Sequence, residues 1–173
     1  MQMPAAEAPD RTCPVLEGTN RILRMALAPS SEAELRSVCL AVAEEVGSAT
    51  WSFLGEIDPV GERLVRVAVG ARGWPMEDGD TAGLADGLNT IFARVLATGE
   101  GEIVHDPAGA SGGVPFRSLL AVPLRDGAVT GGLFALASDK ATFGRRDLEA
   151  AEALAPEILQ ALRRKRDETI RRA

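Results

Sequence analysis

The sequence has few of the residues on which metal sites and disulfide scaffolds are built. It contains two cysteines and a single histidine among 173 residues, and no CxxC, HxxxH or HExxH spacing. Two cysteines do not form a disulfide framework in a chain of this length, and no protein metal site is expected. No apolar run approaches the roughly 20 residues of a membrane-spanning helix, and the N-terminus lacks a signal-peptide core. We therefore expect a cytoplasmic protein with no membrane contact.

The charge is of the wrong sign for a nucleic-acid partner. Residues 163–173 hold six basic and two acidic side chains, so residues 1–162 carry −10 against a net charge of −6 for the whole chain. An acidic body offers no electrostatic footprint for phosphates, and the basic end is interpreted as a solvated helix. The length and a hydrophobic content of 46% are typical of one globular domain.

The apolar periodicity predicts an α+β domain. Strands that meet in hairpins, with helices grouped at both ends of the chain, indicate an antiparallel sheet. A capping box at Ser31 and Glu34 marks the start of the second helix. The expected elements are helices over 16–28 and 31–47, strands over 50–57 and 63–69, a helix over 88–98, strands over 102–105, 118–124 and 131–137, and a helix from 147 onward.

The hairpin formed by residues 118–124 and 131–137 is expected at the centre of the sheet. Asp126-Gly127 supplies its turn, and both strands are apolar at odd and even positions alike. Such strands must be covered on both faces. The last helix would cover one face, and the other is free to wall a pocket. The glycine-rich segments 70–87 and 106–117 are loops, and loops of such length often act as lids or binding segments.

The last helix carries a heptad-like apolar seam, which predicts helix pairing with a second copy. Pro156 lies inside this helix and is expected to kink it. The seam residues are Leu148, Ala151, Ala155, Ile158 and Leu162.

Three segments together have a recognisable pattern: Ser118-Leu-Leu-Ala-Val-Pro-Leu-Arg-Asp-Gly127, Gly131-Gly-Leu-Phe-Ala-Leu-Ala-Ser138 and Asp147-Leu-Glu-Ala-Ala-Glu-Ala-Leu-Ala-Pro-Glu157. They resemble the GAF domain family, and the likeness covers roughly residues 18–166. It implies an antiparallel sheet of about six strands, with a helical bundle on one face and a loop-covered small-molecule pocket on the other. Residues 1–15 would then be a disordered leader, 16–162 the GAF domain and 163–173 a basic helical extension.

The resemblance also implies a function. GAF modules of this type sense small molecules in signal transduction, in two-component systems among others. They act as dimers through their N- and C-terminal helices and regulate an output module of kinase or PAS type.

Position in the expected fold selects seven ligand-binding candidates. If they converge, an apolar pocket with one arginine would suit a small aromatic or carboxylate ligand; plain core packing is the alternative. The single histidine could face the pocket and hold haem or an anion, or could instead be a surface imidazole beside Asp106. The candidates are Trp51, Phe53, Trp74, Phe92, His105, Phe116 and Arg117.

Two other functions stay open. One is a ligand-free interaction module whose pocket is filled by its own side chains. The other is a GAF-type methionine sulfoxide reductase, but such enzymes use cysteines clustered around the pocket, whereas Cys13 falls in the leader and Cys39 on a helix core face. We therefore expect no enzyme. The cofactor is unknown: the Cys-His pair of chromophore-linking GAF domains and the NKxnFxxxDE pattern of cyclic-nucleotide GAF domains are both missing.

Overall fold

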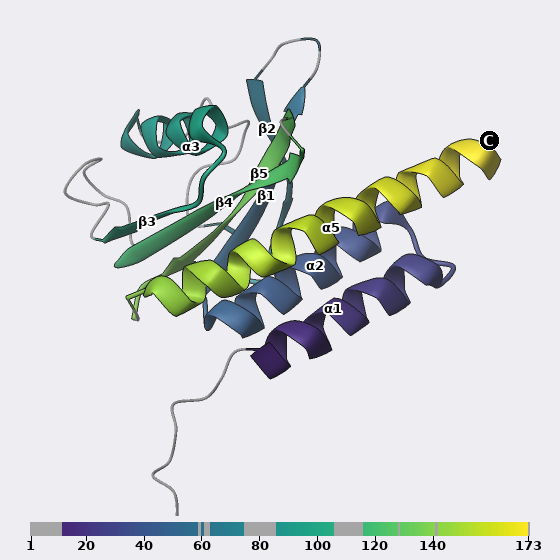
Figure 1. The fold of residues 1–173 in the computed structure, drawn as a ribbon, viewed down its shortest axis with the longest axis horizontal. Helices are drawn as coiled ribbons and strands as arrows, with labels where there is room; N and C mark the ends of the chain where they lie inside the picture. The colour runs from purple at the N-terminus through teal and green to yellow at the C-terminus, as the bar shows by residue number, and fades with distance from the viewer. Residues whose placement is uncertain are drawn as a thin grey trace, which may run out of the picture.

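The computed structural model describes residues 12–58, 60, 63–74, 86–105, 116–127, 129–140 and 142–172. They form one antiparallel sheet in the strand order β2-β1-β5-β4-β3, together with four helices (Figure 1). The elements are α1 (Thr12–Leu27), α2 (Glu32–Gly47), β1 (Trp51–Asp58), β2 (Arg63–Val69), α3 (Asp86–Thr98), β3 (Glu102–His105), β4 (Ser118–Asp126), β5 (Val129–Ser138) and α5 (Arg145–Arg172).

The α+β architecture is confirmed, and so are all five strands predicted from residue patterns. The resemblance implied about six strands; five lie within the described ranges. The leader 1–15 was expected to be without structure, but α1 begins at Thr12. Residues 1–11 and most of the two glycine-rich loops (75–85 and 106–115) lie outside the described residues.

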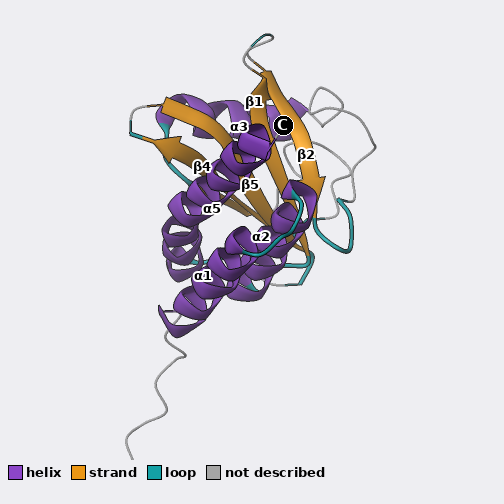
Figure 2. Cartoon of the chain, turned by 90° about the vertical axis from the view of Figure 1, so that its right-hand side faces the viewer, coloured by secondary structure: helices purple, strands orange, loops and turns teal. Residues whose placement is uncertain are grey.

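The central hairpin separates two hydrophobic cores. Along β4, Leu120 faces a core shared with α1, α2 and α5, which we call the helix-side core, whereas Leu119 faces a second core shared with α3, the α3-side core. Phe134 and Ala135 divide in the same way on β5, since successive side chains of a strand point to opposite faces. Figures 1 and 2 show α3 on one side of the sheet and the other three helices on the opposite side.

The second helix begins as the capping box predicts. The Ser31 hydroxyl accepts a hydrogen bond from the Glu34 backbone N–H at 3.1 Å, and the Glu34 carboxylate accepts one from the Ser31 N–H at 3.0 Å. These bonds satisfy two N–H groups that a helix start leaves unpaired. The side chains of α2 that face the sheet, from Leu35 to Val46, then fill the helix-side core.

The apolar seam of the last helix is used within the chain itself. Ala151, Ala155, Ile158 and Leu162 are at most 4% exposed and belong to the helix-side core, against which Leu148 also packs. The seam is therefore used within the chain and gives no support to pairing with a second copy, and the dimer itself stays a prediction. The helix runs without interruption through Pro156, and none of the described helices is long and apolar enough to cross a membrane.

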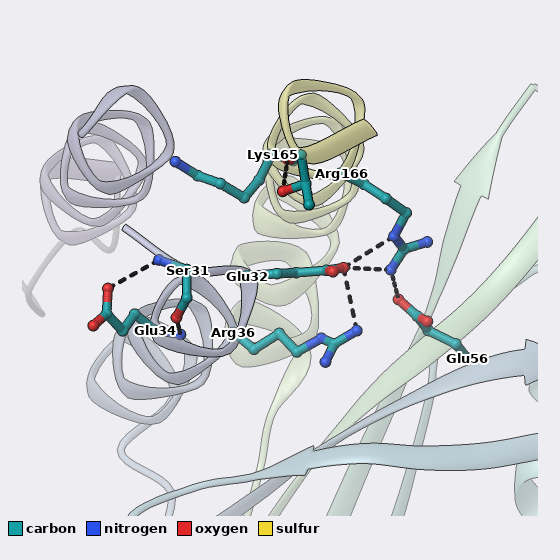
Figure 3. Close-up of polar contacts among 8 residues, drawn as sticks. Ser31, Glu32, Glu34, Arg36, Glu56, Lys165 and Arg166 are labelled. Atoms are coloured by element: carbon teal, nitrogen blue, oxygen red, sulfur yellow. Dashed lines mark hydrogen bonds and ion pairs between the residues drawn. The ribbon is translucent and has the colours of Figure 1, made fainter. Parts of the chain in front are cut away.

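The basic end of α5 docks on the domain (Figure 3). Lys165 is 3% exposed, and its ammonium donates a 2.8 Å hydrogen bond to the backbone carbonyl of Ala28, just after α1 ends. Arg166 reaches the carboxylates of Glu32 at 2.6 Å and Glu56 at 2.8 Å, and so ties α5 to both α2 and β1. The first turn of the expected extension is thus part of the folded body.

Gly132 lies where strands β1 and β5 come close together, and substitution there tests their pairing. A Cβ atom added at Gly132 would lie 2.2 Å from the Gly55 carbonyl oxygen, whereas one at Gly131 would meet nothing closer than 4.0 Å. We expect Gly132→Ala to lower the free energy of unfolding by about 2 kcal/mol or more, because the two strands must separate. Gly131→Ala should leave it unchanged or raise it by up to about 1 kcal/mol. Urea denaturation measures both, and equal effects would contradict this pairing.

Candidate functional site

Five aromatic side chains meet on the α3 side of the sheet. Their ring centroids lie 5.0 Å apart for Trp74 and Phe116, and 5.3 to 5.6 Å apart for the other contacting pairs. The rings are tilted against one another, the arrangement that their quadrupoles favour. We call this group the aromatic cluster; it consists of Trp51, Phe53, Trp74, Phe92 and Phe116.

Four separate parts of the chain bring the cluster together. Trp51 and Phe53 alternate on β1 and so share the face toward α3. Phe92 comes from α3 itself, and Phe116 lies two residues before the start of β4. Trp74 follows a tight turn closed by the Gly73 N–H on the Gly70 carbonyl at 2.9 Å, with Gly73 at a φ of 77°. The convergence expected from the sequence is therefore present for all five aromatic candidates.

The indole N–H of Trp74 is buried without a partner. Trp74 is 7% exposed, and among the described residues no acceptor pairs with its Nε1 atom. A buried donor left unpaired costs about 1–3 kcal/mol. A ligand or water that presents an acceptor to this atom would recover that free energy.

The two remaining candidates lie outside the cluster. Arg117 is exposed, and its backbone N–H donates to the Ser138 carbonyl at 2.7 Å. His105 pairs with Ser118 across β3 and β4, and its Nδ1 lies 3.3 Å from the Ser118 hydroxyl. The neighbouring Val104 packs against the α3-side core. His105 therefore lies on the opposite face of the sheet, and its expected approach to the pocket is not found.

Ser118 is a structural residue that the sequence did not single out. It is fully buried, and its hydroxyl accepts a 3.0 Å hydrogen bond from the backbone N–H of Phe143. This bond fixes the segment that leads into α5 onto the first residue of β4. The imidazole of His105 belongs to the same junction, which lies on the helix side of the sheet.

A pair of polar side chains that no sequence pattern indicated lies where α2, β1 and the turn before Trp74 meet. The carboxylate oxygen Oε1 of Glu44 and the hydroxyl of Ser52 are both buried, lie close enough to interact with each other, and have no other hydrogen-bond partner in the described structure. A Cβ added at Gly70 would lie 2.4 Å from the first atom and 2.5 Å from the second. A side chain at position 70 would have to push the Glu44 carboxylate and the Ser52 hydroxyl aside. Burial raises the pKa of Glu44, and the nearby Ser52 hydroxyl offsets part of that rise.

The described cysteine thiol is not activated. Cys39 is fully buried in the helix-side core, and burial raises its pKa to about 12. It is therefore a neutral thiol at physiological pH. Cys13 falls within α1 and not in a leader. Among the residues described, no group of three or more His, Cys, Asp or Glu side chains could hold a metal ion.

The chain folds as an α+β domain, with three helices on one face of its antiparallel sheet and an aromatic cluster beneath a single helix on the other. A family model described as a GAF domain matches residues 29–163. The match covers most of the chain, so the chain belongs to the GAF domain family. No curated protein matches the sequence.

Solved structures agree on the fold. Free methionine-R-sulfoxide reductase from Neisseria meningitidis superposes with a TM-score of 0.71 at 18% identity, over 97% of this chain and 99% of that one. The GAF domain of an Acinetobacter phosphoenolpyruvate-protein phosphotransferase gives 0.68 at 12% identity, over 92% and 98%. A GAF domain assigned to a sensor histidine kinase of Pseudomonas syringae pv. tomato gives 0.58 at 17% identity, over 94% and 93%.

The expectation that the chain is not an enzyme was wrong. A GAF-fold reductase matches it over nearly the full length of both chains, so the fold accommodates catalysis as readily as sensing. The error was to let the positions of two cysteines decide the class. At identities this low the likeness establishes the fold, which does not separate the two classes.

The raised pKa of Glu44 predicts how stability depends on pH. Because the folded-state pKa lies above the ordinary value of 4.5, the protonated carboxyl stabilises the fold below that pH, and this contribution is lost as pH rises through the folded pKa. Glu44→Gln, which stays neutral, should therefore unfold at a higher urea concentration than the parent at pH 7, but not near pH 4. Glu45→Gln is the matched control, since Glu45 is exposed and pairs with Arg21. A gain for Glu44→Gln that persists unchanged at pH 4 would contradict the assignment.

Proposed function

We propose that this GAF domain is a regulatory sensor that binds a small molecule at the aromatic cluster and acts in signal transduction. The observation that carries the proposal is the buried N–H of Trp74, which finds no acceptor among the described residues although it lies in a cluster with four other rings. Buried polar atoms are nearly always paired, so an exception within a cluster of large apolar side chains supports a site for an acceptor.

The residues around this donor suggest the chemistry of the ligand. The rings would stack against a flat apolar group, and the Trp74 N–H would donate to a carbonyl or carboxylate oxygen. Arg117 directly follows Phe116 and is exposed, so its guanidinium would be available to an acidic group of a ligand bound at the aromatic cluster. A small aromatic acid combines these features.

Strand β1 offers a route from the cluster to the last helix. It carries Trp51 and Phe53 toward α3, and Glu56, near its other end, holds Arg166 of α5 (Figure 3). A ligand that displaces the rings would shift β1 and with it this ion pair. We propose that α5 passes the change to an output module of kinase or PAS type.

Two observations support other functions, which the experiment must also test. The five rings already contact one another, which supports a ligand-free interaction module with a self-filled pocket. The full-length likeness to a methionine-R-sulfoxide reductase supports sulfoxide reduction, although the neutral thiol of Cys39 does not supply the thiolate which that chemistry needs. The compound panel should therefore contain free methionine-R-sulfoxide, with its consumption followed in the presence of a thiol reductant.

Tryptophan fluorescence tests the proposal directly, because both tryptophans of the chain belong to the cluster. A ligand from a panel of small aromatic acids should change the emission and raise the thermal midpoint. Trp74→Phe keeps a ring in place and removes the N–H. It should weaken binding of that ligand about tenfold, the equivalent of a hydrogen bond worth roughly 1–1.5 kcal/mol.

Trp51→Phe is the matched control and should change the affinity by less than about threefold, since both variants keep an aromatic side chain. Equal weakening by the two substitutions would contradict the role of the Trp74 donor. If no compound shifts either signal and methionine-R-sulfoxide is not consumed, the ligand-free module replaces the sensor.

A further inference from the structure

A groove of about 500 Å³ lies between α5 and the edge of the sheet, a volume typical of small-molecule sites. Helix α5 lies along β4 on this side (Figure 1), and Gly99 and Gly101, which follow α3, also line the groove. Strand β3 is four residues long and pairs with β4 no further than Ala121, so the part of β4 beyond that residue borders the groove.

Pro156 leaves one backbone acceptor of the groove without its usual donor. Each carbonyl of a helix accepts from the N–H four residues further on, and proline has no N–H, so the Glu152 carbonyl loses that bond. Glu152 and Pro156 both line the groove, so the freed oxygen faces it. Proline destabilises a helix interior, and neither the fold nor the aromatic cluster gives this residue a role.

The edge of the sheet adds a second free carbonyl. The Ala121 oxygen lies on the outer side of β4, since a Cβ atom added at Gly101 would be 3.3 Å from it. Carbonyls two residues apart on a strand point the same way, so that of Pro123 also faces outward, beyond the reach of β3. Proline is found at such open edges because it has no N–H for a neighbouring strand.

Two carboxylates make the groove rich in acceptors. Glu100 and Glu152 are exposed, and neither forms an ion pair with any residue in the described ranges. The Glu152 carboxylate reaches across the groove, because a Cβ at Gly101 would lie 3.1 Å from its Oε1 atom. Arg125 also lines the groove, but its guanidinium donates to the Gly99 carbonyl at 3.1 Å. Two carboxylates against one guanidinium leave an excess of negative charge.

We propose that this groove binds a small aliphatic diamine in its ammonium form. An ammonium group has three donors and no acceptor, which complements the two free carbonyls and the Glu152 carboxylate. The second ammonium would extend toward Glu100, and the alkyl chain would lie on Val122 and Ala155, which belong to the helix-side core. The aromatic cluster is on the other face of the sheet, so either site can fail without the other.

An amide NMR titration of the full chain with 1,4-diaminobutane tests the site. We expect a dissociation constant of about 1 mM or lower, with the largest shifts at Gly99, Gly101 and Arg125. Butane-1,4-diol has the same length and no charge, and it should cause no shifts. Equal shifts with the diol, or shifts spread evenly over the acidic surface, would overturn the proposal.

Two variants with one matched control decide whether the groove itself is the site. Glu152→Gln should weaken binding about fivefold, because it removes the carboxylate. Pro156→Ala supplies the missing N–H, so it should raise the urea midpoint and also weaken binding about fivefold. Glu149→Gln removes the same charge from α5 outside the groove, where Glu149 pairs with Arg145 at 3.3 Å, and should change affinity less than twofold.

The control and the proline variant can each contradict the proposal. Equal weakening by Glu149→Gln and Glu152→Gln would mean that the amine is attracted to the acidic domain as a whole. A more stable Pro156→Ala variant with unchanged affinity would mean that the freed carbonyl does not bind the amine and that the proline is only a structural feature.

Discussion

The structure depends on the burial of β4 and β5 on both faces. Neither strand can expose one face to solvent. From Leu119 to Leu124 and from Leu133 to Ala137, every side chain other than Pro123 is at most 2% exposed, and Pro123 is buried as well. The chain must therefore cover the sheet twice, with three helices on one face and with α3 and the aromatic cluster on the other. The candidate site lies on the α3 side of the sheet, where a single helix and a few neighbouring residues cover the strands.

That constraint explains how much the sequence could predict. Alternation along β1 places Trp51 and Phe53 together without any knowledge of contacts, and the hairpin pattern predicts strands covered on both faces. His105 was selected by its place beside the expected pocket, and only the register of the four-residue strand β3 against β4 shows which face of the sheet its imidazole takes. Glu44 and Ser52 carry no sequence pattern at all; only the meeting of three elements at Gly70 shows their burial.

The heptad pattern of α5 was ambiguous for a physical reason. A helix that packs on a sheet and two other helices shows the same apolar spacing as one that pairs with a partner, and periodicity alone does not distinguish them. Exposure does. The apolar residues of α5 up to Leu162 fill the helix-side core, whereas Leu16, Leu23 and Leu27 on the outer face of α1 are exposed. The basic end of α5 likewise resembled a solvated extension until Lys165 and Arg166 were seen docked on α1, α2 and β1.

Native-state hydrogen exchange tests the central claim that the two-faced hairpin holds both layers together. If both cores depend on β5, the amides from Leu133 to Ala137 should exchange only by global unfolding, with an opening free energy equal to that of denaturant unfolding. Amides of α3, which covers only one face, should exchange through smaller openings. Exchange of the β5 amides at a lower free energy than those of α3 would contradict the account.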